Sequence, residues 1–116
     1  MSYIRKFSTG IIAFAAMTAI GMGQSGAAEK INFVLNWVPG GDHSPVYWAK
    51  AQGWYSKAGI DLTIENGTGS GASAKKVGIG RNQVGIADLP TALRAIGKGA
   101  DILAVMNIYA NSPYGI

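Results

Sequence analysis

The first candidate functional segment is residues 36–44, with the sequence Asn-Trp-Val-Pro-Gly-Gly-Asp-His-Ser. It joins an apolar run to a predicted helix, so its backbone N–H groups would lie at a helix N-terminus and attract hydrogen-bond acceptors or anions. Trp37 offers a flat face for stacking. His43 and Asp42 supply hydrogen-bonding groups of both kinds. The segment is a candidate ligand site; the alternative is that Trp37 packs in the core and His43 satisfies a turn.

A second candidate is the glycine-rich stretch of residues 67–72, Gly-Thr-Gly-Ser-Gly-Ala. Glycines let a backbone approach a ligand closely. The stretch also fits the dinucleotide pattern G-x-G-x-x-A, and Asp88 follows about 20 residues later, as that fingerprint requires. An NAD(P)-dependent oxidoreductase is therefore one alternative, although the pattern follows the second predicted strand instead of the first. A plain turn without a ligand is the other.

The third candidate is the segment Asp88-Leu89-Pro90-Thr91, in which Asp88 is a suitable helix N-cap. The basic residues Lys75, Lys76 and Arg81 are expected to form a solvated helix face. The chain has no cysteine and one histidine, which excludes thiol catalysis and a site with several histidines. Without a visible catalytic set, the sequence predicts a protein that is not an enzyme and holds no metal or cofactor.

Strand and helix signals alternate along the chain and must position these candidates. Apolar, β-branched runs predict strands at residues 31–36, 61–65, 84–87 and 102–108. Between them, helices are expected from Ser44 through Lys57, over 72–79, and after the Asp88 cap, with Leu89, Leu93 and Ile96 on one face. Ser44 is expected to cap the first of these helices. This order predicts an α/β fold with a mostly parallel sheet and flanking helices, and such sheets bind ligands at the carboxyl ends of their strands.

The first 28 residues have the layout of a secretory signal peptide. Arg5 and Lys6 precede an apolar run from Ile11 to Ile20, and small residues lead to Ala27 and Ala28. Without this leader the formal net charge falls from +4 to +2, because the leader holds two basic residues and no acidic ones. That small charge gives no reason to expect nucleic acid as a partner.

Several of these motifs together resemble the opening of a known family. They are Leu-Asn-Trp-Val-Pro at 35–39, His43, Tyr-Trp-Ala-Lys-Ala-Gln-Gly-Trp-Tyr at 47–55, Ala-Gly-Ile-Asp-Leu at 58–62, the glycine-rich stretch, and Val-Gly-Ile-Ala-Asp at 84–88. The chain resembles the substrate-binding proteins of ABC importers, in the nitrate/sulfonate/taurine group with its thiamine-pyrimidine-precursor-binding relatives. The resemblance covers residues 30–116.

The resemblance implies that residues 29–116 are the first part of lobe one of a two-lobed type II periplasmic-binding fold, with the second lobe absent. The expected function is a monomeric periplasmic protein that captures a small polar or aromatic solute and delivers it to membrane permease subunits. An alternative is a thiamine-pyrimidine synthase-like enzyme that uses a reactive histidine, for which His43 is available. The ligand-binding residues that the resemblance implies are Asn36, Trp37, His43, Gly69, Ser70, Gly71, Asp88 and Asn107.

Overall fold

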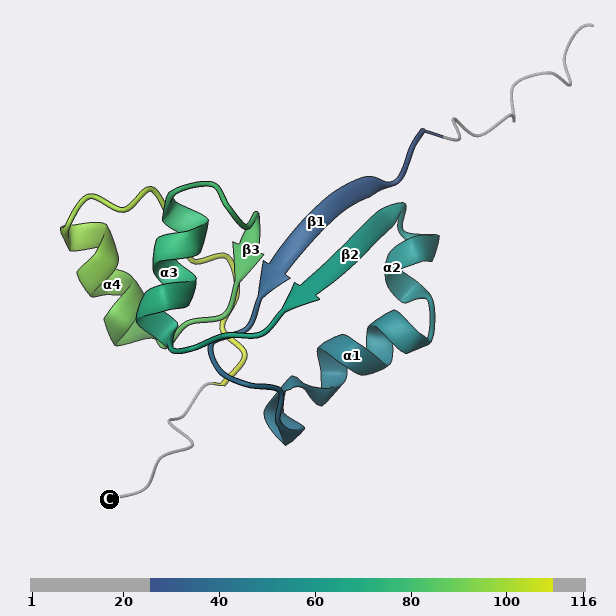
Figure 1. The fold of residues 1–116 in the computed structure, drawn as a ribbon, viewed down its shortest axis with the longest axis horizontal. Coiled ribbons are helices and arrows are strands. Elements are labelled where there is room, and N and C mark those ends of the chain that lie inside the picture. The colour runs from purple at the N-terminus through teal and green to yellow at the C-terminus, as the bar shows by residue number, and fades with distance from the viewer. Residues whose placement is uncertain (1–25, 110–116) are drawn as a thin grey trace, which may run out of the picture.

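The computed structural model describes residues 26–109 and contains a three-stranded parallel sheet (Figure 1). The strands are β1 (Glu29–Val34), β2 (Ile60–Glu65) and β3 (Val84–Gly85), in the spatial order β2-β1-β3. Strand β1 pairs with β2 along its whole length, from Glu29 opposite Ile60 to Val34 opposite Glu65. Strand β3 pairs with only the last two residues of β1. The carboxyl ends of all three strands therefore meet at one edge.

Helices flank this sheet on both sides. The short 3-10 helix η1 (Gly41–His43), α1 (Ser44–Ala51) and α2 (Trp54–Lys57) connect β1 to β2, and α2 contacts β2. Helix α3 (Ser70–Gly78) contacts β3 and α4 (Leu89–Gly97). Figure 1 shows α3 and α4 side by side, with the chain entering both helices at the end toward which the strands point. The predicted α/β class with a parallel sheet and flanking helices is confirmed.

The buried apolar core of the described residues is small and centres on the end of β1. Val34 and Leu35 are consecutive and both almost fully buried, and Leu62 of β2 and Ala74 of α3 pack into the same core. Two consecutive buried residues are expected in a central strand, because its two faces are both covered. The core thus fixes the position of the end of β1, where the candidate segment 36–44 begins.

The single helix predicted from Ser44 through Lys57 is wrong in one respect, because it is broken at Gly53. This glycine has φ 69°, a left-handed conformation that costs glycine little, and it ends α1 before α2 begins. The predicted cap at Ser44 is also wrong. His43 occupies the N-cap position without a side-chain capping bond, and Ser44 is already helical. Trp54 of α2 is exposed.

The predicted fourth strand at residues 102–108 does not form, and this part of the chain is irregular. A strand needs a neighbour to accept its backbone hydrogen bonds. The predicted third strand has also shortened to the two residues of β3, which offer little edge for pairing. Leu103 is consequently 84% exposed and Val105 82% exposed.

Helix α4 also has an apolar face that is exposed in the described part of the chain. Leu89, Leu93 and Ile96 were predicted to line one face, and all three side chains are exposed. The helix itself lies at the predicted place, so its apolar face has formed without being buried in the described part of the chain.

Charged side chains hold the end of β2 against α3. Lys76 Nζ donates to Glu65 Oε1 at 2.7 Å, and Asn82 Nδ2 donates to Glu65 Oε2 at 3.0 Å. The hydrogen bond from Lys76, then that from Asn82, lowers the pKa of Glu65 below its ordinary value of 4.5. Lys76 is thus paired and only partly exposed, which corrects the expectation that it belongs to a solvated face.

The predicted leader lies almost wholly outside the described residues, since only residues 26–28 of it are included. Among residues 26–109, no helix combines the length and apolar character that crossing a membrane demands.

Gly67 lies so close to β1 that replacing it by alanine should cost about 3 kcal/mol of unfolding free energy, the upper end of the cost of over-packing. An added Cβ would lie 2.0 Å from the carbonyl oxygen of Leu35 and 2.6 Å from the carbonyl carbon of Asn36. Urea unfolding of the full chain, followed by circular dichroism, measures the change.

Gly41→Ala is the matched control, because a Cβ there meets nothing within 4 Å. It should change the unfolding free energy by less than about 0.5 kcal/mol. Equal losses in the two variants would contradict the close approach at Gly67.

Candidate functional site

Three loop segments meet where the strands end, and backbone hydrogen bonds tie them together. The Gly69 N–H donates to the Asn36 carbonyl at 2.8 Å, and the Gly67 N–H donates to the Trp37 carbonyl at 3.0 Å. These bonds hold the loop after β2 alongside the loop after β1. The first two predicted segments are therefore neighbours in space, as the carboxyl-end rule for parallel sheets requires.

The third segment joins them through Ser70. The backbone N–H of Asp88 donates to Ser70 Oγ at 3.0 Å, which brings the N-terminus of α4 to that of α3. A Cβ added at Gly71 would lie 3.9 Å from Thr91 Cγ2, so the first turns of the two helices are in contact distance. The Ala72 and Ser73 amides of α3 donate to the Gly69 carbonyl at 3.0 and 3.1 Å, so the Ser70 and Gly71 amides are the ones at the start of α3 that can face an acceptor.

Asp88 caps α4 as the sequence predicts. Its Oδ2 accepts the Thr91 N–H at 2.8 Å. Hydrogen bonding from Thr91 lowers the pKa of Asp88 below its ordinary value of 3.8, and Ser70 and the positive charge of Arg94 act in the same direction. The carboxylate is therefore ionised at neutral pH, and it remains exposed at the edge of the sheet.

Trp37 is the exposed aromatic residue of this edge. Its backbone is held by Gly67, yet its side chain is 58% exposed. The alternative in which Trp37 packs in the core is therefore wrong. A fixed backbone that presents a free indole can stack against a planar ligand.

His43 is placed differently, because it is only 2% exposed. Its Nδ1 accepts the Gly40 N–H at 3.1 Å, and its Nε2 lies 2.8 Å from Asn36 Oδ1. Both ring nitrogens are thus engaged, which agrees with the alternative that His43 satisfies a turn. The ring links the end of β1 to the start of α1 and does not face open solvent, so this geometry speaks against the reactive role considered for it.

Asn107 does not occupy the place predicted for it. It was expected at the end of a fourth strand, and the segment that contains it forms no strand. The structure brings together the other seven predicted residues: Asn36, Trp37, His43, Gly69, Ser70, Gly71 and Asp88.

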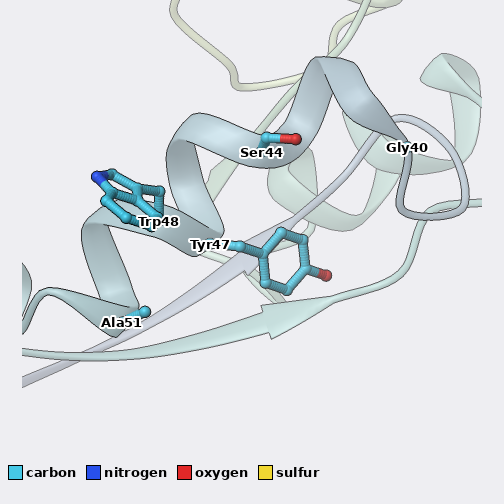
Figure 2. Close-up of a pocket in the computed structure, with 5 residues that line it drawn as sticks. All are labelled: Gly40, Ser44, Tyr47, Trp48 and Ala51. Atoms are coloured by element: carbon cyan, nitrogen blue, oxygen red, sulfur yellow. The ribbon is translucent and has the colours of Figure 1, made fainter.

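A shallow hollow of about 350 Å³ lies apart from the strand ends, over the outer face of α1 (Figure 2). Ser44, Tyr47, Trp48 and Ala51 line it at helical spacing, and Gly40 closes one end. Gly40 and Ser44 belong to the candidate segment 36–44, but none of the eight predicted ligand-binding residues lines the hollow, and its lining is mostly apolar. Converging hydrogen-bonding groups are what orient a small polar ligand, so we place the candidate site at the strand ends.

Sequence reasoning included two glycines of this edge in its candidate segments but missed the part that each plays. There is no room for a side chain at Gly67, and the Gly40 N–H donates to His43 Nδ1. The signal for Gly40 was present, since a histidine three residues after it can accept its N–H at the start of a helix, as in a capping box.

The site offers little to a metal or a dinucleotide. Among residues 26–109, no group of three His, Cys, Asp or Glu side chains could hold a metal ion. In the dinucleotide fold the acidic residue follows the strand beside the glycine loop. Here Asp88 follows β3, which β1 separates from β2 and its glycine-rich loop, so the geometry disfavours the oxidoreductase alternative.

Comparison with known families places the chain more closely. The family described as "NMT1/THI5 like" matches residues 41–116, which is more than half of the chain and includes the loops after β2 and β3. The chain belongs to the NMT1/THI5-like family. This agrees with the broad resemblance to proteins that bind thiamine-pyrimidine precursors.

Named relatives of this NMT1/THI5-like chain are yeast enzymes. The 4-amino-5-hydroxymethyl-2-methylpyrimidine phosphate synthases THI12 and THI5 of Saccharomyces cerevisiae are each 27% identical over 82 residues, 71% of this chain and 24% of theirs. The synthase of Schizosaccharomyces pombe is 25% identical over 88 residues, 76% of this chain and 25% of its own. The chain thus spans about a quarter of the length of these relatives.

These relatives overturn the prediction that the protein is not an enzyme, because each is named as a synthase. The prediction depended on the lack of a familiar catalytic set within this NMT1/THI5-like chain. A segment that aligns with a quarter of an enzyme need not contain a whole catalytic set, so that reasoning was unsound.

Replacing Asp88 by alanine should lower the unfolding free energy by about 1 kcal/mol at pH 7, the usual cost of losing an N-cap. Asp88→Asn is the matched variant, because asparagine caps helices equally well and lacks the charge. Urea unfolding at pH 7 and at about pH 3 separates the two effects.

The sign of the pH effect follows from the lowered pKa of Asp88. Stability from the ionised form is fully present above the ordinary value and is lost as the pH falls through the folded-state value. The gap between wild type and Asp88→Asn should therefore shrink in acid. A gap that does not change with pH would contradict the capping role of the charge.

Proposed function

We propose that this chain forms one wall of a site for a phosphorylated aminopyrimidine, in a protein that acts as a synthase of the kind named for its yeast relatives. The observation that carries the proposal is the meeting of the Trp37 turn, the loop before α3 and Asp88 at one edge of the sheet. Stacking, hydrogen-bond acceptance and free amides together suit a planar, amino-substituted, phosphorylated ring.

Trp37 supplies the stacking surface in this proposal. Its carbonyl and that of Asn36 are bonded to the glycine-rich loop, so the backbone beneath the indole is fixed before a ligand arrives. Such preorganisation reduces the entropy that binding would otherwise cost. A pyrimidine ring has the flat apolar faces that pack on an indole.

Asp88 supplies the acceptor for the amino group. A carboxylate can accept more than the one backbone hydrogen bond that Thr91 donates, and Asp88 is exposed. The Ser70 and Gly71 amides at the start of α3 and the hydroxyl of Ser70 add donors for acceptor atoms of the ligand. An ionised Asp88 can accept a hydrogen bond from an amino group and would repel an oxoanion, so in this proposal the amino group of the ligand, and not its phosphate, faces Asp88.

His43 is assigned to positioning in this proposal. It is the one histidine of the chain, it is buried, and its two nitrogens hold Gly40 and Asn36. A ring that reacted would first have to leave both bonds. The proposal therefore places no reaction step on His43.

A second candidate function is the solute-binding component of an ABC importer in the periplasm, acting with membrane permease subunits. The observation that favours it is the leader pattern in residues 1–28 of the sequence. Both candidates use the same aminopyrimidine-binding edge. Export and cleavage of the leader in cell fractions would favour the importer, whereas formation of the pyrimidine phosphate by the uncleaved chain would favour the synthase.

Trp37→Ala should weaken binding of 4-amino-5-hydroxymethyl-2-methylpyrimidine phosphate about tenfold, because it removes the stacking surface. Isothermal titration calorimetry of the full chain measures the affinity, with taurine and nitrate as competing ligand classes. Tight binding of either anion, with none of the pyrimidine, would overturn the proposal.

Trp48→Ala is the matched control. Trp48 is 62% exposed, close to the exposure of Trp37, and lies on the outer face of α1 (Figure 2). It should leave the affinity unchanged. Equal losses in the two variants would remove the Trp37 turn from the site.

A further inference from the structure

The proposed function leaves the phosphate of the ligand without a charged partner, because the amino group faces Asp88. In 4-amino-5-hydroxymethyl-2-methylpyrimidine phosphate, the compound for which the yeast synthases are named, the amino group and the hydroxymethyl group that bears the phosphate stand on neighbouring ring atoms, at positions 4 and 5. The group that binds the phosphate must therefore lie close to Asp88, within about one helical turn.

Arg94 is a cation that lies at this distance. Its Nη2 donates to Thr91 Oγ1 at 2.8 Å, so the side chain folds back along α4 toward the first turn of the helix. Hydrogen bonding from Thr91 is the main cause of the lowered pKa of Asp88, and the charge of Arg94 adds to it, so the guanidinium acts on this carboxylate. Thr91 thus holds the guanidinium near Asp88.

The guanidinium has hydrogen-bonding capacity to spare. It carries five N–H donors in one plane, and in the described part of the chain it makes one hydrogen bond, to Thr91. Among residues 26–109, Arg94 forms no ion pair, and its side chain is exposed. The planar fork of an arginine matches the paired oxygens of a phosphate and can bind two of them at once.

Two hydroxyl groups beside Arg94 also have a proton to donate. Ser70 Oγ accepts the Asp88 N–H at 3.0 Å, and Thr91 Oγ1 accepts the bond from Arg94. A hydroxyl can donate its own proton while it accepts. Neither hydroxyl donates to another residue between positions 26 and 109. Both protons are therefore available to a ligand, and every oxygen of a phosphate can accept one.

Helix α3 comes close to these groups because Gly71 has no side chain. Helices α3 and α4 lie side by side (Figure 1). A Cβ added at Gly71 would lie 3.9 Å from Thr91 Cγ2, so no side chain separates the start of α3 from Thr91. The guanidinium on α4 and the Ser70 hydroxyl on α3 consequently flank the same junction between the two helices.

We infer that Thr91 and Arg94 form the phosphate subsite of this edge, with the Ser70 hydroxyl as a further donor. The inference rests on the proposed function and adds two residues to the ligand-binding set. Asp88 binds the amino group and Arg94 binds the phosphate. The two opposite charges also fix the orientation of the ring, because the reversed ligand would set its phosphate against a carboxylate.

The first test uses inorganic phosphate and no pyrimidine. The full chain is titrated at constant ionic strength, kept with sodium chloride, and followed by ¹H–¹⁵N NMR. The Arg94 Nε–H and the backbone amides of Ser70 and Gly71 should shift together. In Arg94→Met the apparent affinity at Ser70 and Gly71 should fall about tenfold, the effect of losing one charge-assisted hydrogen bond. Shifts that are the same without Arg94 would overturn the inference.

Lys98→Met is the matched control for charge. Lys98 directly follows α4, is exposed, and forms no ion pair in the described part of the chain. Its loss removes the same charge from the other end of the same helix. The variant should bind phosphate like wild type. An equal loss in Lys98→Met and Arg94→Met would show a diffuse effect of charge and no subsite.

A pair of substitutions tests Thr91. Thr91→Val keeps the methyl group near Gly71 and removes the hydroxyl, so phosphate affinity should fall about threefold to tenfold, the effect of a neutral hydrogen bond. Thr91→Ser restores the hydroxyl and should restore the affinity. Equal affinities in the two variants would remove Thr91 from the subsite.

The second test compares two ligands by isothermal titration calorimetry: the pyrimidine phosphate and its alcohol, 4-amino-5-hydroxymethyl-2-methylpyrimidine. Wild type should bind the phosphate about tenfold more tightly than the alcohol. Arg94→Met should bind both with the affinity that wild type has for the alcohol. Damage to the whole edge would weaken both ligands, so the ratio between them isolates recognition of the phosphate.

The outcomes separate this inference from the proposed function. If Arg94→Met keeps the wild-type ratio, the subsite is wrong and the aminopyrimidine site stands. If wild type binds neither pyrimidine, the proposed function fails, and the shifts with inorganic phosphate decide whether Thr91 and Arg94 bind that anion.

Discussion

The close approach of two backbones is the constraint on which the rest of this structure depends. Residues 35–37, where β1 ends, run against residues 67–69, where β2 has ended, and Gly67 fits there only because it has no side chain. This contact fixes Trp37 and the start of α3 relative to each other. The hydrogen bond from the Asp88 N–H to Ser70 Oγ then positions Asp88. The arrangement of the whole edge therefore depends on Gly67, a position at which no larger residue fits.

Local chemistry predicted much of this arrangement. The β-branched runs located β1 and β2, and a carboxylate before Leu-Pro-Thr located the cap of α4, because both signals act within a few residues. The break at Gly53 could not be read, since a glycine inside a helical pattern is compatible with continuing the helix or ending it. The failure at residues 102–108 has another cause. The sequence of these residues favours a strand, but it does not show whether a neighbouring strand is available to pair with them.

Topology predicted which segments meet at the candidate site, whereas the individual residues were implied by the family resemblance. Parallel strands bring their carboxyl ends together whatever their sequence, and this placed seven of the predicted residues at one edge. The turn role of His43 was one of two predicted alternatives, and the sequence could not decide between them because the burial of the ring depends on Asn36, seven residues earlier. Catalysis was misjudged for a related reason: the names of the relatives refer to chains about four times as long as the matched segment.

The exposed segment after α4 has a consequence for self-association of this protein. Leu103, Val105 and Met106 are exposed in a stretch without β pairing, beside a sheet whose β3 edge is two residues long. Unpaired backbone that carries exposed apolar side chains can pair with other chains. Crowded solutions should therefore favour association between copies through this stretch, and a charged residue at Val105 would act as a gatekeeper that keeps the chain dispersed.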